Sequence, residues 1–227
     1  SRFDGMLIDQ FGVIHDGQQL YPGTLRVLNE LHALNIPVAV MTNSGKRAEA
    51  NRQRLVSMGV PRDHFADAVS SCEVAFSGLT AKRAFLIGKD GEDYGFEGLT
   101  FISDPKDAEI ILILGSNAPK TSLEDYRRLL TGLTLPAICC NPDKLMLTPQ
   151  GLMPAPGAIA ALYEEMGGPV TWIGKPYPQI YRAAAQLIGN PSRILCIGDS
   201  AEHDVAGGRG AGFSTLLVLQ GVSAGHD

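Results

Sequence analysis

The chain has 227 residues, of which 44% are hydrophobic and 19% charged, and its formal net charge is −5. This composition is typical of a globular protein, and the acidic balance argues against nucleic acid and anionic membranes as partners. No apolar run approaches the roughly 20 residues of a membrane-spanning helix, and the opening SRFDGMLID lacks the pattern of a signal peptide.

Strand-like and helical patterns alternate over the first 66 residues. The expected elements are a strand at 6–9, a hairpin at 13–21, a helix at 22–35, a strand at 36–43 and a helix at 45–59. The hairpin depends on Asp16-Gly17, a pair that suits a tight turn with positive φ angles. The second helix closes at Gly59, a residue type that commonly ends helices. This alternation indicates an α/β fold with a largely parallel sheet.

The middle of the chain contains a second, compact α/β unit. It is expected to hold strands at 84–88, 99–102, 108–115 and 136–140, with a helix near 122–130. The first pattern then resumes with a strand, a loop and a helix within 169–189 and two strands within 193–219. The simplest description is a split core, residues 1–66 and 167–227, with residues 67–166 inserted between its halves.

Three polar motifs directly follow predicted strands. Asp9 ends the first strand, where the carboxyl ends of a parallel sheet form the ligand crevice, although a turn-forming Asp would look the same. Thr42 and Asn43 end the second strand and, with Ser44, could hold phosphate oxygens at a helix start or simply cap that helix. Lys175 follows a third strand, and the prolines beside it restrict its backbone; a solvated loop lysine is the plainer alternative.

A fourth motif is acidic. The stretch CIGDSAEHD places Asp199 at a strand tip and Asp204 five residues later. Two carboxylates at a strand end suit Mg²⁺, which takes few protein ligands and keeps several waters. The GGRGAG stretch that comes next follows an acidic loop and not a strand, so we interpret it as small residues that allow close helix packing.

The order of these motifs is more specific than any one of them. An Asp, a Thr-Asn pair, a Lys and finally an acidic pair are what metal-assisted transfer through an aspartyl intermediate requires. A response-regulator receiver also combines Asp, Thr and Lys on an α/β sheet. It would carry its acidic pair before the phosphorylated Asp, so the order excludes a receiver.

The sequence resembles the haloacid dehalogenase (HAD) superfamily, and within it class IIA, the NagD-like and nitrophenylphosphatase-like hydrolases. The similarity runs from about Phe3 to Ser223. It rests on GVIHDG with YPG, on TNSGKR, on CNPD with PAPGAI, and most specifically on IGKPYPQIY and IGDSAEHDVAGGRGAGFSTLLVLQGVS. The resemblance implies a Rossmann-like parallel-sheet core with an inserted α/β cap of the C2 type, which agrees with the compact middle unit.

The resemblance also implies roles for individual residues. The catalytic residues would be the nucleophile Asp9, the charge-stabilising Lys175 and the phosphate-positioning Thr42. Further contacts to substrate or phosphate would come from Asn43, Ser44, Asn141 and Asp143, the last two near the junction between cap and core. A Mg²⁺ cofactor would be held by Asp9, the backbone carbonyl of Phe11, Asp199 and Asp204, the last through a bound water.

Phe11 departs from the family pattern, because phosphatases of this superfamily carry an Asp there that protonates the leaving oxygen. General acid–base help of this kind is typically worth about 10²–10⁴-fold in rate. Three functions therefore stay open: a magnesium-dependent phosphomonoesterase helped by His15 or a water, a haloacid dehalogenase-like hydrolase, and a phosphate-binding protein with weak or lost turnover. We favour the first, because dehalogenases need no magnesium and would leave Asp199 and Asp204 without a role.

The remaining expectations concern thiols and partners. Cys72, Cys139, Cys140 and Cys196 lack zinc-site spacing, and adjacent cysteines on a strand point to opposite faces. Free thiols in a reducing cytoplasm are therefore expected. The expected partner is a small phosphorylated substrate, with no nucleic acid and no membrane, and a homo-oligomer is compatible with the sequence.

Overall fold

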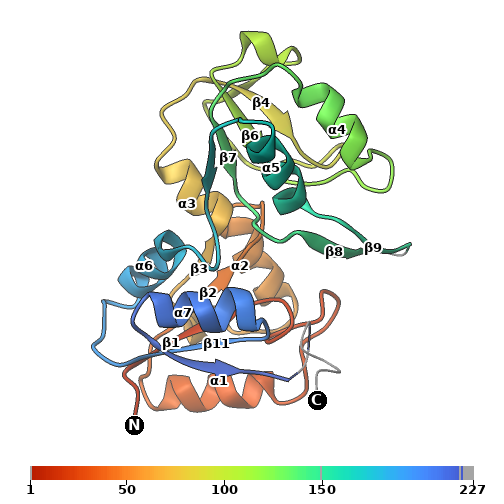
Figure 1. Cartoon of the computed structure of the whole chain (residues 1–227). Coiled ribbons are helices and arrows are strands. Elements are labelled where there is room, and N and C mark those ends of the chain that lie inside the picture. Colours follow the sequence, from red (N-terminus) through yellow and green to blue (C-terminus); the bar gives the residue numbers. More distant parts are fainter. Residues whose placement is uncertain (1, 149, 220, 222–227) are drawn as a thin grey trace. The chain divides into compact units, whose positions relative to one another are not determined.

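The computed structural model describes residues 2–148, 150–219 and 221, so the end of the predicted core range, residues 222–227, lies outside them (Figure 1). The helices are α1 Thr24–Ala33, α2 Ala48–Ser57, α3 Ser71–Ser77, α4 Leu123–Leu130, α5 Pro156–Glu165, α6 Pro178–Leu187 and α7 Ala206–Gly210, with short turns η1 Arg62–His64, η2 Pro105–Asp107 and η3 Ala201–Val205. The strands are β1 Gly5–Asp9, β2 Val38–Thr42, β3 Ala68–Ser70, β4 Arg83–Ile87, β5 Thr100–Phe101, β6 Ile110–Ile113, β7 Ala137–Cys139, β8 Leu145–Thr148, β9 Gly151–Pro154, β10 Val170–Trp172, β11 Ile194–Gly198 and β12 Ser214–Leu217.

The chain divides into two compact units. Unit 1 comprises Ser1–Thr42, Ala48–Ser70 and Lys175–Asp227, and unit 2 comprises Asn43–Arg47 and Ser71–Gly174. Each unit is built around one five-stranded sheet in which every pair of neighbouring strands is parallel. Strand pairing decides where the units divide: β3 pairs with β2 in unit 1, whereas β10 pairs with β7 in unit 2.

Unit 1 has the strand order β12-β11-β1-β2-β3. Alternate residues of β1 and β2 point to one face, where Met6, Ile8, Val38 and Val40 form a buried cluster with Leu28 of α1. Leu28 is the one buried leucine of the helical repeat predicted for residues 22–35, and α1 itself begins only after Gly23, which has a φ of 88°. Figure 1 shows α7 on the opposite face of this sheet from α1.

The glycines of the GGRGAG stretch allow the close helix packing that was predicted for them. A Cβ on Gly207 would overlap the Tyr181 hydroxyl of α6, and a Cβ on Gly208 would lie 2.7 Å from Thr215 Cγ2 of β12. Because both glycines lie in α7, this short helix approaches α6 and the sheet more closely than larger residues would permit. The prediction of a packing role is confirmed.

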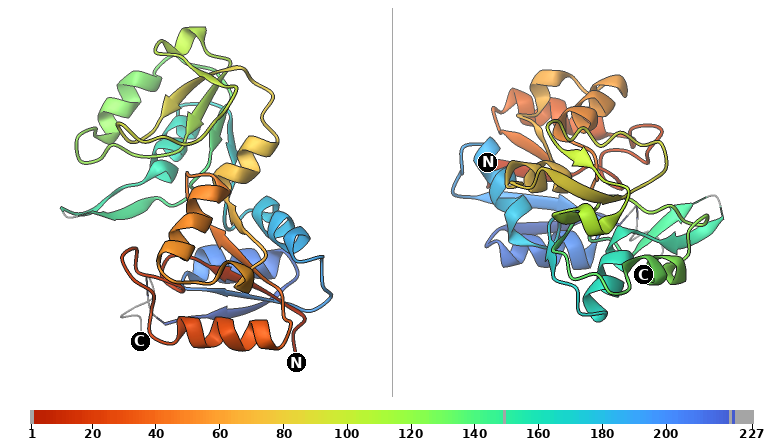
Figure 2. Two further views of the ribbon diagram at one scale, coloured as in Figure 1. Left: turned by 180° about the vertical axis from the view of Figure 1, so that it is seen from behind. Right: turned by 90° about the horizontal axis from the view of Figure 1, so that it is seen from above.

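Unit 2 has the strand order β10-β7-β6-β4-β5 and an apolar layer on each face of its sheet. On one face Ile111 and Ile113 of β6 pack with Tyr126 of α4 and Ile159 of α5. On the other, Leu112 of β6 packs with the buried residues of α3, and Figure 2 shows α3 (yellow) and α4 (green) on opposite sides of the sheet. The helix expected near 122–130 begins with a capping box, in which Ser122 accepts from the Asp125 N–H and Asp125 accepts from the Ser122 N–H.

Several elements differ from the sequence-based expectations. The hairpin predicted for residues 13–21 is reduced to single bridges, His15 with Leu20 and Phe11 with His15, although Gly17 does have a positive φ of 101°. The strand expected before Lys175 exists as β10 but belongs to the sheet of unit 2. The antiparallel pair β8–β9 and helix α5 were not expected at all. Within the described part of the chain, no helix combines the length and apolar character needed to cross a membrane.

Candidate active site

Two carboxylates lie at the same edge of the unit 1 sheet. Asp9 is the last residue of β1, and the parallel register pairs Ile8 with Ile197 of β11. Asp199 directly follows β11, so it comes just after the residue that neighbours Asp9. Both side chains are buried, with exposed fractions of 6% and 3%. The carboxyl ends of two adjacent parallel strands therefore deliver two acidic groups to one place, as expected for a ligand crevice.

Asp204 joins them from η3, one turn of π-helix that begins immediately after Ser200. Its backbone N–H donates to the Ser200 carbonyl at 2.9 Å, and its Oδ2 accepts from the Ser200 N–H at 3.1 Å. The buried hydroxyl of Tyr181 donates to the His203 carbonyl at 2.7 Å, which ties the turn to α6. These bonds fix the direction of the Asp204 side chain.

Lys175 connects the acidic groups. Its Nζ lies 2.7 Å from Asp9 Oδ1 and 2.7 Å from Asp204 Oδ1, and the residue is only 3% exposed. The Asp9 Oδ1 atom also accepts from the Gln10 N–H at 2.7 Å. A buried lysine held by two carboxylates is the opposite of the solvated loop lysine that the sequence left open.

The electrostatics of this group show an excess of negative charge. Burial raises the pKa of Asp9 well above its usual range; Lys175 opposes that shift, while the charges of Asp204 and Asp199 add to it. Burial alone would lower the pKa of Lys175, but Asp204 and Asp9 outweigh it and the net shift is upward. Lys175 therefore stays protonated, and one ammonium faces three carboxylates.

The three carboxylates can hold a cation. One oxygen from each of Asp9, Asp199 and Asp204 lies within 4.8 Å of the others, and all three residues are buried. A Cβ on either Gly12 or Gly221 would overlap the Asp199 carboxylate. Both glycines have positive φ angles, 85° and 62°, which side chains rarely permit. A hard divalent cation fits this set of oxygen donors, because its charge would balance carboxylates that one lysine leaves uncompensated.

Phe11 lies outside this buried group. Its side chain is 52% exposed, and its ring contacts His15 edge-on at 5.8 Å between centroids. It therefore does not fill an apolar niche, and a polar side chain at this position would reach solvent. Whether its backbone carbonyl binds metal stays a prediction.

His15 is not available to solvent. It is 1% exposed, and its Nδ1 accepts from the Gly17 N–H at 2.9 Å, so the proton of the neutral ring lies on Nε2. Burial lowers the pKa of His15, and the charge of Arg54 lowers it further. The ring is thus neither a surface turn histidine nor open to solvent, and its bond from the Gly17 N–H supports the turn after Phe11.

The remaining predicted site residues are divided between unit 1 and unit 2. Thr42 ends β2 in unit 1, one residue beyond Met41, which pairs with Asp9. Asn43 belongs to unit 2, where its Nδ2 donates to Asp143 Oδ1 at 3.0 Å and its Oδ1 accepts from the Ser71 hydroxyl at 3.4 Å.

Unit 2 also contains the other two residues to which substrate contacts were assigned. Ser44 Oγ accepts from the Lys46 N–H at 3.2 Å. Asn141 Oδ1 accepts from the Asp143 N–H at 3.0 Å. Their functional roles stay predictions.

Sequence reasoning missed the residues that support the acidic group. Tyr181 looked like an ordinary helix residue, and Gly12 and Gly221 looked like loop residues. Tyr181 and Gly221 lay within the two stretches that carried the family resemblance most specifically, but nothing in those stretches indicated a supporting role. Contacts between residues so distant in the chain leave no local pattern that could have been detected.

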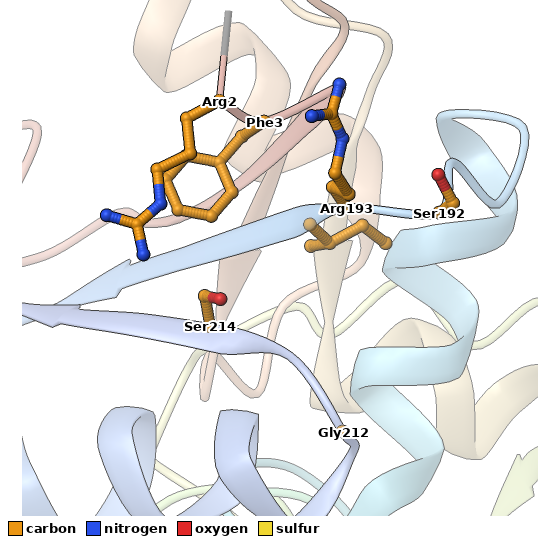
Figure 3. Close-up of a pocket in the computed structure, with 7 residues that line it drawn as sticks. Arg2, Phe3, Ser192, Arg193, Gly212 and Ser214 are labelled. Atoms are coloured by element: carbon orange, nitrogen blue, oxygen red, sulfur yellow. The ribbon is translucent and has the colours of Figure 1, made fainter.

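A pocket of about 300 Å³ in unit 1 lies elsewhere, beside the beginnings of β11 and β12 (Figure 3). Among the residues that line it are Arg2, Ser192, Arg193 and Ser214. Arg193 is engaged by Asp4 through bonds of 2.9 and 2.6 Å. Because β11 begins here and ends next to Asp199, this pocket is at the opposite end of the strand from the carboxylates.

Comparisons with known proteins assign the chain to a family whose members are hydrolases. A family profile described as haloacid dehalogenase-like hydrolase matches residues 6–126, and a second HAD-like profile matches residues 172–227. The chain belongs to the haloacid dehalogenase-like hydrolases. The family resemblance and the α/β fold class predicted from the motifs are thus confirmed, and the protein is a hydrolase.

Individual relatives of this HAD-like hydrolase are named as phosphatases. A dihydroxyacetone phosphatase of Corynebacterium glutamicum (strain R) is 29% identical over 228 residues, which cover 96% of this chain and 81% of the relative. The ribonucleotide monophosphatase NagD of Escherichia coli (strain K12) is 23% identical, with coverage of 98% and 90%. A crystal structure of a haloacid dehalogenase-like hydrolase from Brucella suis 1330 superposes with a TM-score of 0.84 at 30% identity, covering 98% of this chain and 88% of that one.

Proposed function

We propose that this HAD-like hydrolase is a magnesium-dependent phosphatase that hydrolyses a small phosphate monoester through an aspartyl-phosphate on Asp9. The observation that carries the proposal is the Lys175 ammonium, which lies 2.7 Å from both Asp9 and Asp204 in a buried acidic group. Relatives that match nearly the whole chain are named as phosphatases.

Mg²⁺ would be held by Asp9, Asp199 and Asp204, with the carbonyl of Phe11 as a further ligand. When bound, it would neutralise charge on the phosphate oxygens and on the carboxylates. This assignment is supported by three oxygen donors within 4.8 Å of one another and by the close approach of Gly12 and Gly221 to Asp199.

The protein's own residues account for the covalent steps. Gln10 N–H and Lys175 Nζ both contact Asp9 Oδ1, so we assign the attack on phosphorus to Oδ2. As the Oδ2–P bond forms, the ester P–O bond breaks and the leaving oxygen takes the electron pair. Water then attacks the phosphorus of the acyl phosphate, which releases phosphate and restores the Asp9 carboxylate. Lys175 and the Thr42 hydroxyl would hold the phosphoryl oxygens during both steps.

Phe11, which cannot donate a proton, should make the rate of hydrolysis depend on the leaving group of the ester. The leaving oxygen must take its proton from water, because a phenylalanine has none to give and His15 is enclosed. Esters with acidic leaving groups depend least on such a proton. We therefore expect high relative rates for aryl or acyl phosphates and low rates for simple alkyl phosphates.

Unit 2 would act as the substrate-selecting cap domain, with Asn43, Ser44, Asn141 and Asp143 as candidate substrate contacts. This proposal is supported by the resemblance to class IIA and by the interruption of unit 1 between Ser70 and Lys175. An Asp143→Ala variant should then change the KM values of different esters unequally while leaving their kcat values similar. A cytoplasmic location is supported by four buried cysteines, all free thiols.

The test is a panel of phosphate esters with and without Mg²⁺, run beside a panel of 2-haloacids with halide detection. Asp9→Asn should lower phosphate release by at least about 10⁴-fold, because an amide cannot form the acyl phosphate. Asp16→Asn is a matched control, since Asp16 is an exposed turn carboxylate whose Oδ1 accepts from the N–H groups of Gln18 and Gln19. Halide release by the wild type without phosphate release would overturn the proposal in favour of a dehalogenase.

A further inference from the structure

A second group of metal-ligating side chains lies in unit 1, away from the acidic residues of the active site. His32 comes from the last turn of α1, and Asp63 and His64 come from η1. One ligand atom from each lies within 4.8 Å of the others. His32 and Asp63 are exposed and His64 is partly buried, so solvent reaches the group.

The surroundings of the His64 ring are unusual. Its Nε2 lies 2.8 Å from Asn29 Oδ1, and its Nδ1 lies 2.9 Å from Asp63 Oδ1. Both partners are oxygen acceptors, whereas a neutral imidazole carries only one N–H. Without a cation, the ring satisfies both oxygens only as an imidazolium or after the Asn29 amide turns over. A metal ion bound to Nδ1 and Asp63 would resolve the conflict and leave Nε2–H to donate to Asn29.

A shared ion requires small adjustments of the ligand atoms. Nitrogen and oxygen ligands of zinc lie about 2.0–2.2 Å from the metal, which places neighbouring ligands of a tetrahedral site about 3.3–3.6 Å apart. His64 Nδ1 and Asp63 Oδ1 are 2.9 Å apart, so a zinc ion between them would move them about 0.5 Å further apart. His32 Nε2 lies 3.9 Å from Asp63 Oδ2, and its ring stacks on that of His64 at 4.3 Å between centroids and 2° between planes. In the stacked arrangement the two ring planes are parallel, so one ion cannot lie in both planes. The His32 side chain is 47% exposed and must turn out of the stack to become the third ligand.

The helix and the turn that carry the ligands share an apolar cluster. Leu28 of α1 and Phe65, the residue after η1, are each 3% exposed and belong to the same apolar cluster. The helix and the turn that carry the ligands are therefore held together by the core of unit 1. Asn29 is placed to orient His64 through its outer nitrogen, as oxygen acceptors commonly do for metal-bound histidines.

We infer that His32, Asp63 and His64 bind a divalent transition-metal ion such as Zn²⁺, with Asn29 as the orienting residue. Two imidazole nitrogens and one carboxylate favour zinc, cobalt, nickel or copper over magnesium, which prefers oxygen ligands. The ion would link the end of α1 to η1 and so stabilise unit 1. It would take no part in phosphate hydrolysis.

The test uses chelator-treated protein made without a histidine tag and kept in excess Mg²⁺, with Zn²⁺ binding measured by equilibrium dialysis. The wild type should bind one Zn²⁺, and Asp199→Asn should bind it equally well, since Asp199 lies in the acidic group. His32→Ala and His64→Ala should each weaken Zn²⁺ binding by more than about tenfold, and Asn29→Ala by about 10–100-fold. Phosphatase activity of these three variants should equal that of the wild type.

Two controls keep the result interpretable. His226→Ala removes an imidazole at another position of the sequence and should bind Zn²⁺ like the wild type. If an alanine variant fails to fold, the Co²⁺ absorption spectrum of the wild type tests the site directly, because nitrogen and carboxylate ligands of low coordination number give intense visible bands. A wild type that binds no Zn²⁺ in excess Mg²⁺, or His32→Ala and His64→Ala proteins that bind it unchanged, would overturn the inference.

Discussion

The two units share an architecture and differ in how their strands end. Both contain a five-stranded parallel sheet with apolar clusters against it. In unit 1, β1 ends at Asp9 and β11 is followed by Asp199. In unit 2, the equivalent ends of β4 and β6 are followed by Gly88 and by Leu114. The same scaffold therefore supports a buried acidic group in one unit and strand ends without a buried acidic group at β4 and β6 of the other.

This difference shows what a buried charge requires from its surroundings. Three buried carboxylates would be prohibitively costly alone. Unit 1 holds them with Lys175, with the backbone N–H groups of Gln10 and Ser200, and with two glycines that leave room around Asp199. None of these features adds apolar burial, so we expect the acidic group to reduce the stability of unit 1 in exchange for catalysis.

The largest gain in activity should come from placing a carboxylate two residues after Asp9. Phe11→Asp should raise the hydrolysis of alkyl phosphates by up to about 10²–10⁴-fold, because the new side chain can protonate the leaving oxygen. The gain for nitrophenyl phosphate should be smaller. Since Phe11 is 52% exposed, the variant should fold normally.

Phe11→Asn is the matched control, because it has a similar size to Asp but no proton to transfer. Steady-state kinetics on both variants measure the difference. Equal alkyl phosphatase rates for the Asp and Asn variants would contradict the proton-donor explanation.

Removing the ammonium that balances the acidic group should have the next largest effect. Lys175→Met should lower kcat by about 10²–10³-fold, because it removes a charged donor to the phosphoryl group. Without metal, it should also destabilise the protein by about 3–5 kcal/mol, since buried carboxylates lose their partner. Denaturant titrations with and without Mg²⁺ measure this; a loss of stability that Mg²⁺ does not reduce would argue against a metal beside Lys175.

A cavity in the core of unit 2 should lower the free energy of unfolding without changing the binding of Mg²⁺ to unit 1. Ile111 is fully buried in β6, and Ile111→Ala should cost about 2–5 kcal/mol. Because Ile111 belongs to the other unit, the stabilisation of unit 1 by Mg²⁺ should stay as it is in the wild type. Calorimetry with and without Mg²⁺ checks both statements, with Val40→Ala of β2 as the matched cavity in unit 1.

The smallest effect per side chain concerns alkaline pH, where the three thiols of unit 2 outnumber the one of unit 1. Burial raises the pKa of Cys72, Cys139 and Cys196 to about 12 and holds that of Cys140 well above its usual range. An unfolded thiol titrates near pH 8.5, so the folded state binds more protons above that pH. The stabilisation is complete below about pH 8.5 and is lost as the pH rises towards 12, by at most about 1.4 kcal/mol per thiol and pH unit.

The measurement is the free energy of unfolding between pH 8 and pH 10 under reducing conditions. Replacing Cys139 by Ala should flatten the decline, and native thiols should resist alkylation at pH 8. Rapid alkylation of the folded protein would show that the thiols are more accessible than their burial indicates.

The sequence alone determined the class of fold and indicated which residues form the candidate site. Alternating apolar runs and helical repeats are local patterns, and they predicted the α/β class, most strands, and the positions of Asp9, Lys175, Asp199 and Asp204. The order of these residues along the chain indicated metal-assisted transfer through an aspartyl intermediate, and the motif stretches around them carried the resemblance to the family. Their catalytic roles stay predictions.

Tertiary structure decided what depends on contacts between distant residues. Pairing with β7 placed β10 in unit 2, although the sequence before Lys175 looked like a core strand. Asn43, expected to hold phosphate, donates to Asp143, 100 positions away. Phe11 is exposed, and the stacked pair His32 and His64 brings together side chains from α1 and η1. Local patterns could not reveal these features, because each depends on which surfaces meet when the chain folds.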